Sequence, residues 1–203
     1  MKQYEAVVIG VSAGGLRALS ILLSALSAQF PLPLIIVQHT KEGCDSFLAD
    51  HLNSQAPLRV KEADDKEYVQ PGNAYLAPAG YHLLVEEDRS LSLSVDPPVL
   101  HSRPSIDVLF ESAAYVYEQY CIGIVLTGAN GDGSQGLRRI KKHGGLAIVQ
   151  NPETSECATM PDAAIRAAGP DYILDLEDIG TFLNGLGERL MARRHGRKKE
   201  EDL

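Results

Sequence analysis

The segment YEAVVIGVSAGGLRALSILLSAL, residues 4–26, decides how this sequence is expected to fold. Its first part, Tyr4–Ile9, is largely apolar and ends at Gly10. A short apolar run that ends at a glycine is typical of a parallel strand buried on both faces. Leucines then recur at helical spacing over Leu16–Leu26, which predicts a helix. We therefore expect a strand, a glycine-rich turn and a helix.

The same alternation continues along the chain. Leu34–Gln38 is predicted to be a second buried strand and Cys44–Leu52 a helix, and this β-α-β-α order implies a parallel sheet. Three short apolar segments then follow, with turn residues between them. They are Asn73–Ala77, His82–Glu86 and Leu91–Val95. Their length and spacing predict an antiparallel hairpin region at an edge of the sheet.

After this region the α/β alternation resumes. The expected elements are a helix from Pro104 to about Gln119, a strand over Cys121–Leu126, a helix over Gly133–His143, a strand over Leu146–Val149, a helix over Pro161–Ala168, a strand over Tyr172–Leu174 and a helix over Ile179–Met191. We therefore predict an α/β fold, a mostly parallel, doubly wound sheet flanked by helices, with the small antiparallel hairpin region at one edge. Residues 1–192 are expected to form one domain. The charged segment Arg193–Leu203 is expected to be a disordered tail.

Composition limits the range of partners. Hydrophobic residues make up 44% of the chain and charged residues 23%, as in ordinary globular domains. The net charge of −8 argues against nucleic acid as the main partner, because phosphate binding requires basic surface. Cys44, Cys121 and Cys157 form no C-x-x-C pair and indicate reduced thiols. No signal peptide or membrane-spanning segment is apparent, so we expect a cytoplasmic protein with no membrane insertion.

The glycine-rich turn Gly10–Gly15 has three interpretations. A dinucleotide fingerprint would need glycine where Ser12 stands, and an acidic residue at the end of the second strand, where Gln38 and His39 stand. A nucleophile turn, G-x-S-x-G, would place the Ser12 hydroxyl at a helix N-terminus, where free N–H groups favour developing negative charge. The turn could also be an ordinary strand–helix connection that tolerates serine. The pattern alone leaves all three open.

His39 directly follows the strand expected to lie beside the one that precedes Ser12. A general base for Ser12 would be needed at this position, although a histidine here could also be structural. The other histidines have weaker cases. His51 and His143 fall on helices and His195 in the tail, whereas His82 and His101 lie near loops and are not dismissed by the sequence.

A third strand ends in the loop LTGANGDG, residues 126–133. Asp132 at its end could be the N-cap of the next helix, or it could orient His39 through the Nδ1–H group. The order Ser12, His39, Asp132 differs from the Ser…Asp/Glu…His order of the α/β-hydrolases, so a standard α/β-hydrolase is not expected. Triads are defined by their geometry and not by chain order.

Six segments between Val7 and Ile165 together resemble one known family. They are VVIGVSAGG, IIVQHT, PGNAYLAPAGYHLLV, SRPSIDVLFESAA, GIVLTGANGDGSQGL and VQNPETSECATMPDAAI. The chain resembles the catalytic domain of the bacterial chemotaxis protein-glutamate methylesterase, CheB. The resemblance implies hydrolysis of γ-glutamyl methyl esters on chemoreceptor cytoplasmic domains, in some members with glutamine deamidation. It also implies a triad of Ser12, His39 and Asp132, and no metal or organic cofactor.

The resemblance further implies that backbone N–H groups at Ala13 and in the loop Gly128–Ala129–Asn130 hold the oxyanion. Two segments depart from the family pattern: Ala13 stands where members commonly have Thr, and the usual T-G-M-G-x-D-G loop here has Ala129 and Asn130. Well-known members also carry a receiver domain before the catalytic domain. The chain starts at the first catalytic strand, so we expect regulation to be missing or to come from a separate protein. The alternative is a catalytically weak docking module, in which Ser12→Ala would leave the biological role intact.

Overall fold

The central feature of the protein is one seven-stranded sheet. The computed structural model describes residues 3–40 and 47–201, with side chains as far as Arg193. The strands lie in the order β3-β4-β2-β1-β7-β8-β9, and every neighbouring pair is parallel. Their bounds are Ala6–Val11 (β1), Leu34–Gln38 (β2), Arg59–Glu62 (β3), Asn73–Leu76 (β4), Cys121–Val125 (β7), Leu146–Gln150 (β8) and Tyr172–Leu174 (β9). All carboxyl ends of the strands therefore lie at one edge.

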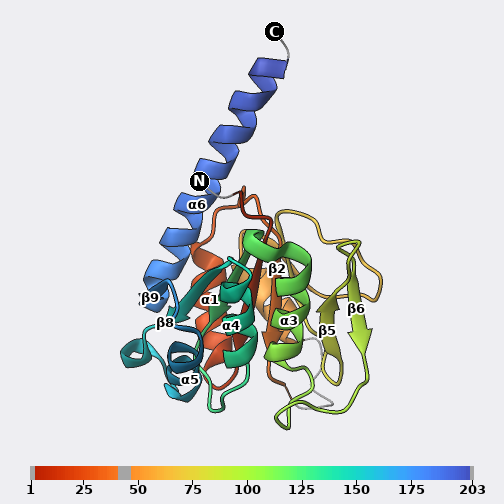
Figure 1. Ribbon diagram of the computed structural model, residues 1–203, viewed down its shortest axis with the longest axis vertical. Helices are drawn as coiled ribbons and strands as arrows, with labels where there is room; N and C mark the ends of the chain where they lie inside the picture. The colour runs from red at the N-terminus through yellow and green to blue at the C-terminus, as the bar shows by residue number, and fades with distance from the viewer. Residues whose placement is uncertain (1–2, 41–46, 202–203) are drawn as a thin grey trace.

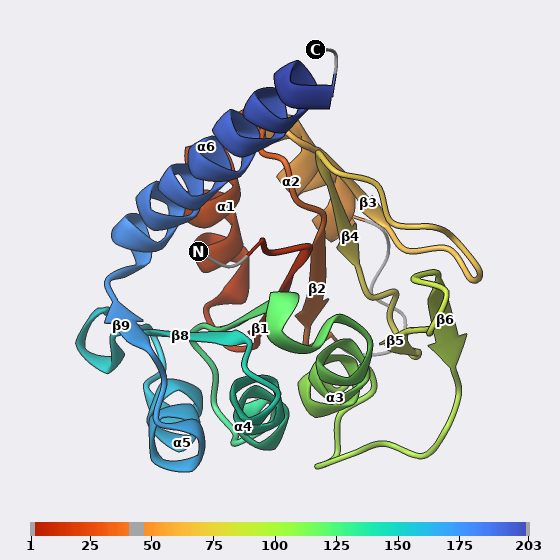
Figure 2. The same cartoon turned by 45° about the horizontal axis from the view of Figure 1, so that its top comes forward.

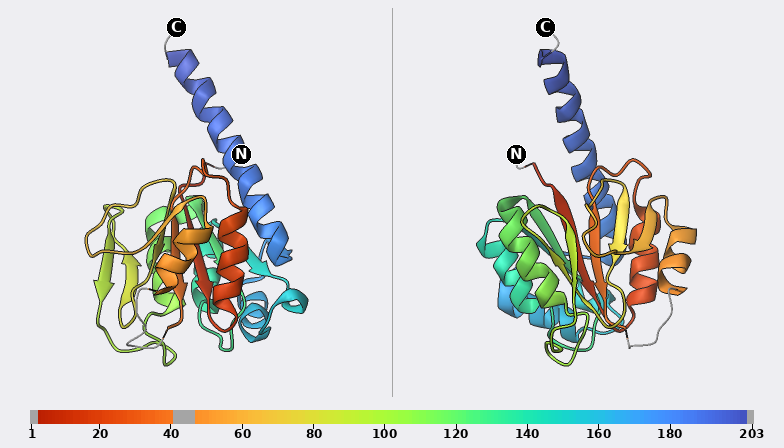
Figure 3. Two further views of the ribbon diagram at one scale, coloured as in Figure 1. Left: turned by 180° about the vertical axis from the view of Figure 1, so that it is seen from behind. Right: turned by 90° about the vertical axis from the view of Figure 1, so that its right-hand side faces the viewer.

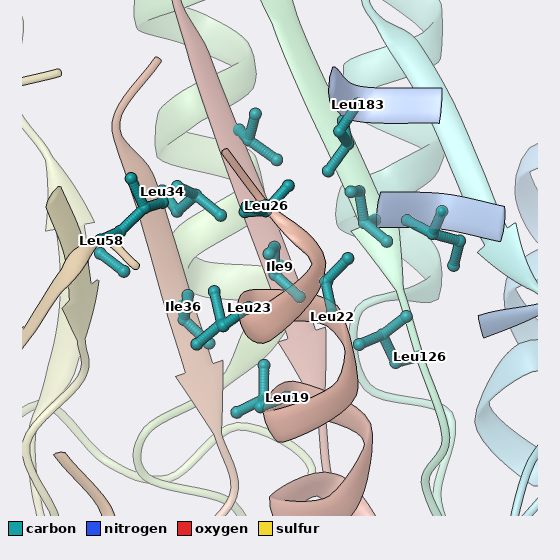
Figure 4. Packing of buried hydrophobic residues seen from close by; sticks show 14 of the residues in the cluster. Ile9, Leu19, Leu22, Leu23, Leu26, Leu34, Ile36, Leu58, Leu126 and Leu183 are labelled. Carbon is teal, nitrogen blue, oxygen red and sulfur yellow. The ribbon is translucent and has the colours of Figure 1, made fainter. Parts of the chain in front are cut away.

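Helices cover both faces of the sheet, as Figures 1 and 2 show. One face carries α1 (Gly15–Ala25), α2 (Phe47–Gln55) and α6 (Leu176–Glu201), and the other carries α3 (Ile106–Tyr117), α4 (Ser134–Lys142) and α5 (Thr159–Ala168). Strand β1 is fully buried because alternate residues enter the two cores. Figure 4 shows the α1 side of this packing, where leucines of the helix lie against Ile9 and Ile36.

The antiparallel region is smaller than the sequence predicts. Strands β5 (His82–Val85) and β6 (Leu91–Ser94) form a separate two-stranded sheet, and β5 packs against α3. The prediction that Asn73–Ala77 belongs to the hairpin is wrong, because β4 lies parallel between β2 and β3. Strand β3 was not predicted, since its short, partly charged sequence RVKE gives little periodic signal.

The helix boundaries also differ from the predictions, most of all at the end of the last helix. Helix α3 begins at Ile106, after the predicted start at Pro104, and a short 3-10 helix follows it at Glu118–Tyr120. The last helix continues to Glu201, whereas the sequence predicted an end at Met191 and then a disordered tail. Arg, Lys and Glu favour helix, which explains the longer helix; Figure 3 shows it projecting beyond the body of the sheet. The predicted start of α2 at Cys44 lies outside the described residues.

The α/β fold with a mostly parallel, helix-flanked sheet is confirmed. Strand β1 lies at the centre, with β2 on one side and β7 on the other. Ligands in such sheets bind at the carboxyl ends of strands where the strand order reverses direction. Ser12, His39 and the loop ending at Asp132 follow β1, β2 and β7, so the fold places them at this point. Among the described residues, no helix combines the length and apolarity needed to cross a membrane.

Candidate active site

Three adjacent strand ends bring Ser12, His39 and Asp132 together. Val11 pairs with Gln38 in the β1–β2 register, so Ser12 and His39 leave the sheet side by side. The Ser12 Oγ atom lies 3.2 Å from His39 Nδ1, and His39 Nε2 lies 2.8 Å from Asp132 Oδ2. A hydroxyl, an imidazole and a carboxylate in an unbroken series of hydrogen bonds form the arrangement of an activated serine nucleophile.

The turn after β1 holds Ser12 at the start of α1. The Ser12 N–H donates to the Thr127 carbonyl at 2.9 Å, and the Gly15 N–H donates to the Ser12 carbonyl at 2.9 Å. Gly14 adopts a φ of 78°, and a Cβ at this position would lie 2.7 Å from the Glu156 Cβ. Glycine is therefore required at Gly14 by both the backbone conformation and the close packing.

The orientation of the His39 ring differs from the prediction. The sequence predicted that Nδ1–H faces the carboxylate, but Nδ1 faces Ser12 and Nε2 faces Asp132. An ionised carboxylate only accepts hydrogen bonds, so Nε2 carries the proton and Nδ1 accepts from the Ser12 hydroxyl. The His39 N–H donates to the Val11 carbonyl at 3.0 Å, which holds this backbone against β1. Because this bond keeps the His39 backbone close to the end of β1, it is Nδ1, the ring nitrogen nearer the backbone, that lies within reach of Ser12.

Asp132 is fully buried, and five donors surround its carboxylate. Besides His39, they are the Ser105 hydroxyl and the backbone N–H groups of Ile106, Asp107 and Gly133, at 2.7–3.0 Å. Burial alone would raise the pKa of Asp132, but the hydrogen bonds from His39, Asp107 and Ile106 outweigh it and lower the pKa. The side chain is thus held ionised beside the imidazole. It caps the start of α3, whereas Gly133 occupies the N-cap of its own helix, α4.

The loop predicted to hold the oxyanion is only partly available. The Gly128 N–H donates to the Cys157 carbonyl at 3.0 Å, so it is already engaged. The N–H groups of Ala13, Ala129 and Asn130 have no hydrogen-bond partner among the described residues. Asn130 instead uses its Oδ1 to accept from the Asp132 N–H at 3.1 Å. The unpaired donors among the described residues of this region are thus backbone N–H groups. One belongs to Ala13 in the turn after β1, and two belong to the loop after β7.

Sequence reasoning missed several residues that hold the site together. Gln38 Nε2 donates to the carbonyls of Ser12 and His39, both at 3.0 Å, and so links the nucleophile to the base. Thr127 Oγ1 donates to the Ala13 carbonyl at 2.8 Å and accepts from the Cys157 N–H at 2.8 Å. The signal available in the sequence was their position, directly beside a predicted site residue or at the end of a predicted strand.

Asp107 forms a second carboxylate close to the triad. It lies in the first turn of α3, is 7% exposed, and accepts a hydrogen bond from the Gly136 N–H at 2.7 Å. Burial raises the pKa of Asp107 to about 6; the Gly136 N–H opposes this rise, and the charges of Asp132 and Glu111 add to it. Asp107 lies near the start of the helix predicted from Pro104, but the sequence gave no indication of this burial.

A groove of about 720 Å³ opens beside Ser12. Its described lining includes both apolar and charged side chains. The lining residues include Leu16, Arg17, Phe47, Leu48 and Glu156. Phe47, which lines this groove, is 67% exposed. A polypeptide side chain could therefore approach the Ser12 hydroxyl from this groove.

Comparison with known proteins agrees with this geometry. The family model of the CheB methylesterases matches residues 7–183. A protein of Leptospira interrogans named "Putative protein-glutamate methylesterase/protein-glutamine glutaminase" is 48% identical over 191 residues, covering 94% of this chain and 99% of that protein. The "Protein-glutamate methylesterase FrzG" of Myxococcus xanthus is 37% identical over 180 residues, covering 89% of this chain and 54% of that protein.

A solved structure also matches closely. The crystal structure of the Thermotoga maritima CheB methylesterase catalytic domain superposes with a TM-score of 0.86 at 34% sequence identity, covering 91% of this chain and 100% of that one. The chain thus spans nearly all of the Leptospira protein and of this catalytic domain, but about half of the Myxococcus protein. The family match, the shared fold and the three adjacent strand ends lead to one conclusion: the chain belongs to the CheB methylesterase family.

Proposed function

We propose that the chain is a serine hydrolase of chemotaxis signalling that removes the methyl group from γ-glutamyl methyl esters of chemoreceptor cytoplasmic domains. The observation that carries this proposal is the continuous series of hydrogen bonds from Ser12 through His39 to buried Asp132, in a member of this family. The names of relatives include glutaminase activity, and the same site would suit a γ-amide as well as a γ-ester. A substrate in the cytoplasm would place the protein there too.

The reaction begins at Ser12. His39 Nδ1 removes the hydroxyl proton as Ser12 Oγ attacks the ester carbonyl, and the resulting imidazolium is stabilised by ionised Asp132 through Nε2–H. The negative charge on the former carbonyl oxygen is held by free N–H groups, with Ala13 on one side and Ala129 or Asn130 on the other. Each such donor is typically worth about 10²–10³-fold in rate. Gly128 belongs to this loop but is not a donor, because its N–H is engaged.

The intermediate then collapses. The ester C–O bond breaks, and methanol leaves with the proton from His39, giving a glutamyl ester on Ser12. A water molecule gives a proton to His39 Nδ1 and attacks this ester. Proton return to Ser12 Oγ releases the glutamate side chain. Base and acid catalysis by one imidazole explains why a single histidine beside Ser12 is sufficient for both steps.

The proposal is tested by methanol release from chemoreceptor cytoplasmic fragments carrying radiolabelled methyl esters. We expect release by the native chain and none above background by Ser12→Ala. Ser24→Ala is the matched control, because Ser24 is an exposed serine of α1 that bonds only within its own helix. Equal release by the native chain and Ser12→Ala would contradict the proposal. A docking module predicts that Ser12→Ala keeps its signalling role, which complementation of a strain lacking the gene would reveal.

A further inference from the structure

The mechanism above gives no role to His82, a buried histidine on the small two-stranded sheet. His82 is the first residue of β5 and is 1% exposed. Figure 2 shows β5 beside α3. The first N–H groups of α3 donate to Asp132, which follows β7 at the carboxyl edge of the main sheet. His82 thus connects the small two-stranded sheet to the start of α3, whose N–H groups donate to Asp132.

The contacts of His82 define its protonation. Its Nε2 lies 3.2 Å from the Pro97 carbonyl oxygen, which can only accept, so Nε2 carries a proton. Its Nδ1 lies 3.1 Å from the Ser105 backbone nitrogen, which can only donate, so Nδ1 is unprotonated. Both ring nitrogens are thus satisfied in one neutral tautomer, and the ring holds the backbone of Ser105 in place.

Ser105 begins the segment that surrounds the triad carboxylate. Its hydroxyl donates to Asp132 Oδ1 at 3.0 Å, and the N–H groups of Ile106 and Asp107 donate to the two carboxylate oxygens at 2.7 and 2.9 Å. The donor groups of Ser105, Ile106 and Asp107 therefore all depend on the position of the Ser105 backbone. A shift of Ser105 would move all three donors, and the carboxylate would move with them or lose its partners.

We propose that His82 is a positioning residue of the triad, which fixes Ser105 and through it holds Asp132 against His39. The inference rests on the proposed hydrolase function, because Asp132 matters to catalysis only if Ser12 is the nucleophile. His82 touches neither substrate nor Ser12. The small sheet is accordingly part of the support of the active site, and its removal or mutation acts on the reaction through Asp132.

Two substitutions separate the two ring contacts. His82→Asn places an amide oxygen near the position of Nδ1 and keeps an acceptor for the Ser105 N–H, whereas His82→Gln reaches the position of Nε2 and loses that acceptor. Small displacements of catalytic groups cost about 10²-fold in rate. We therefore expect kcat for methanol release to fall about 10- to 100-fold in His82→Gln, with KM within about twofold, and to stay within about threefold in His82→Asn. Equal kcat in the two folded variants would overturn the proposal.

A double mutant tests whether the effect passes through Asp132. Combining His82→Gln with Asp132→Asn should lower kcat no further than Asp132→Asn alone, because the pathway is already broken. A full additional loss would mean that His82 acts by another route. Phosphonate labelling of Ser12 gives the same comparison without a receptor. Labelling that slows in His82→Gln supports the positioning role even if methanol release fails and the substrate proposal falls.

Nuclear magnetic resonance of the native chain with ¹⁵N-labelled histidine requires no variant to fold. The proposal expects a proton on Nε2 of His82 and none on Nδ1, as the two hydrogen bonds of the ring require. A proton on Nδ1 would leave no acceptor for the Ser105 N–H and would overturn the proposal, whatever the activity of the protein.

Discussion

Asp107→Asn should stabilise the protein increasingly as the pH rises. The pKa of Asp107 is about 6 in the folded chain, against an ordinary value of 3.8. An acid with a raised pKa binds its proton more tightly in the folded than in the unfolded state, so stability falls as the pH rises through the window from about 4 to about 6. The full difference corresponds to about 3 kcal/mol at pH 8, of which about 2.5 kcal/mol develops above pH 4.

Asparagine removes the buried charge and keeps an oxygen for the Gly136 N–H. The free energy of unfolding of Asp107→Asn, relative to the native chain, should therefore rise by about 2–2.5 kcal/mol between pH 4 and pH 8. Urea unfolding followed by circular dichroism measures it, since the chain has no tryptophan. Asp50→Asn, at an exposed aspartate in the first turn of α2, is the control. A difference that stays constant with pH, or grows towards pH 4, would refute the reasoning.

Three further predictions concern the site itself. Asp132→Asn should lower kcat for methanol release about 10³–10⁴-fold, because the amide cannot hold the same imidazole tautomer; a loss below tenfold would contradict its role. Gly14→Ala should cost more stability than Gly72→Ala in urea unfolding, since both positions have φ near +80° but only Gly14 would clash with Glu156; the shared backbone strain is worth about 1–2 kcal/mol. Gln38→Leu should lower kcat about tenfold by freeing the carbonyls of the nucleophile and the base; unchanged kcat in a folded variant would remove Gln38 from the support of the site.

The strand–turn–helix at the start of the chain was predictable because its signals are local. An apolar run, three glycines and leucines at helical spacing all lie within residues 4–26, and these residues form β1 and α1. The meeting of Ser12 with His39 was predictable too, since consecutive parallel strands joined by one helix usually lie side by side. Asp132 follows a strand much later in the chain, and its place beside His39 depends on β7 pairing with β1.

The features that the sequence did not predict depend on contacts between segments that are distant in the sequence. The sequence of Asn73–Ala77 indicates a short strand but not the direction of that strand. Its direction is set by parallel pairing with β2 on one side and β3 on the other. The ring orientation of His39 depends on how its backbone bonds to β1. The role of Ser105 requires the start of α3 to meet Asp132 across the sheet edge. The hydrophobic pattern within either segment does not indicate which distant segment it will contact.

The central claim is that Ser12, activated by His39 and Asp132, is the nucleophile. Reaction with a fluorophosphonate, followed by intact-mass and peptide mass spectrometry, tests it most directly. We predict one adduct per chain, located on the peptide that contains Ser12, and its loss in His39→Gln. Absence of an adduct in the folded native chain, or an adduct on another serine, would contradict the account.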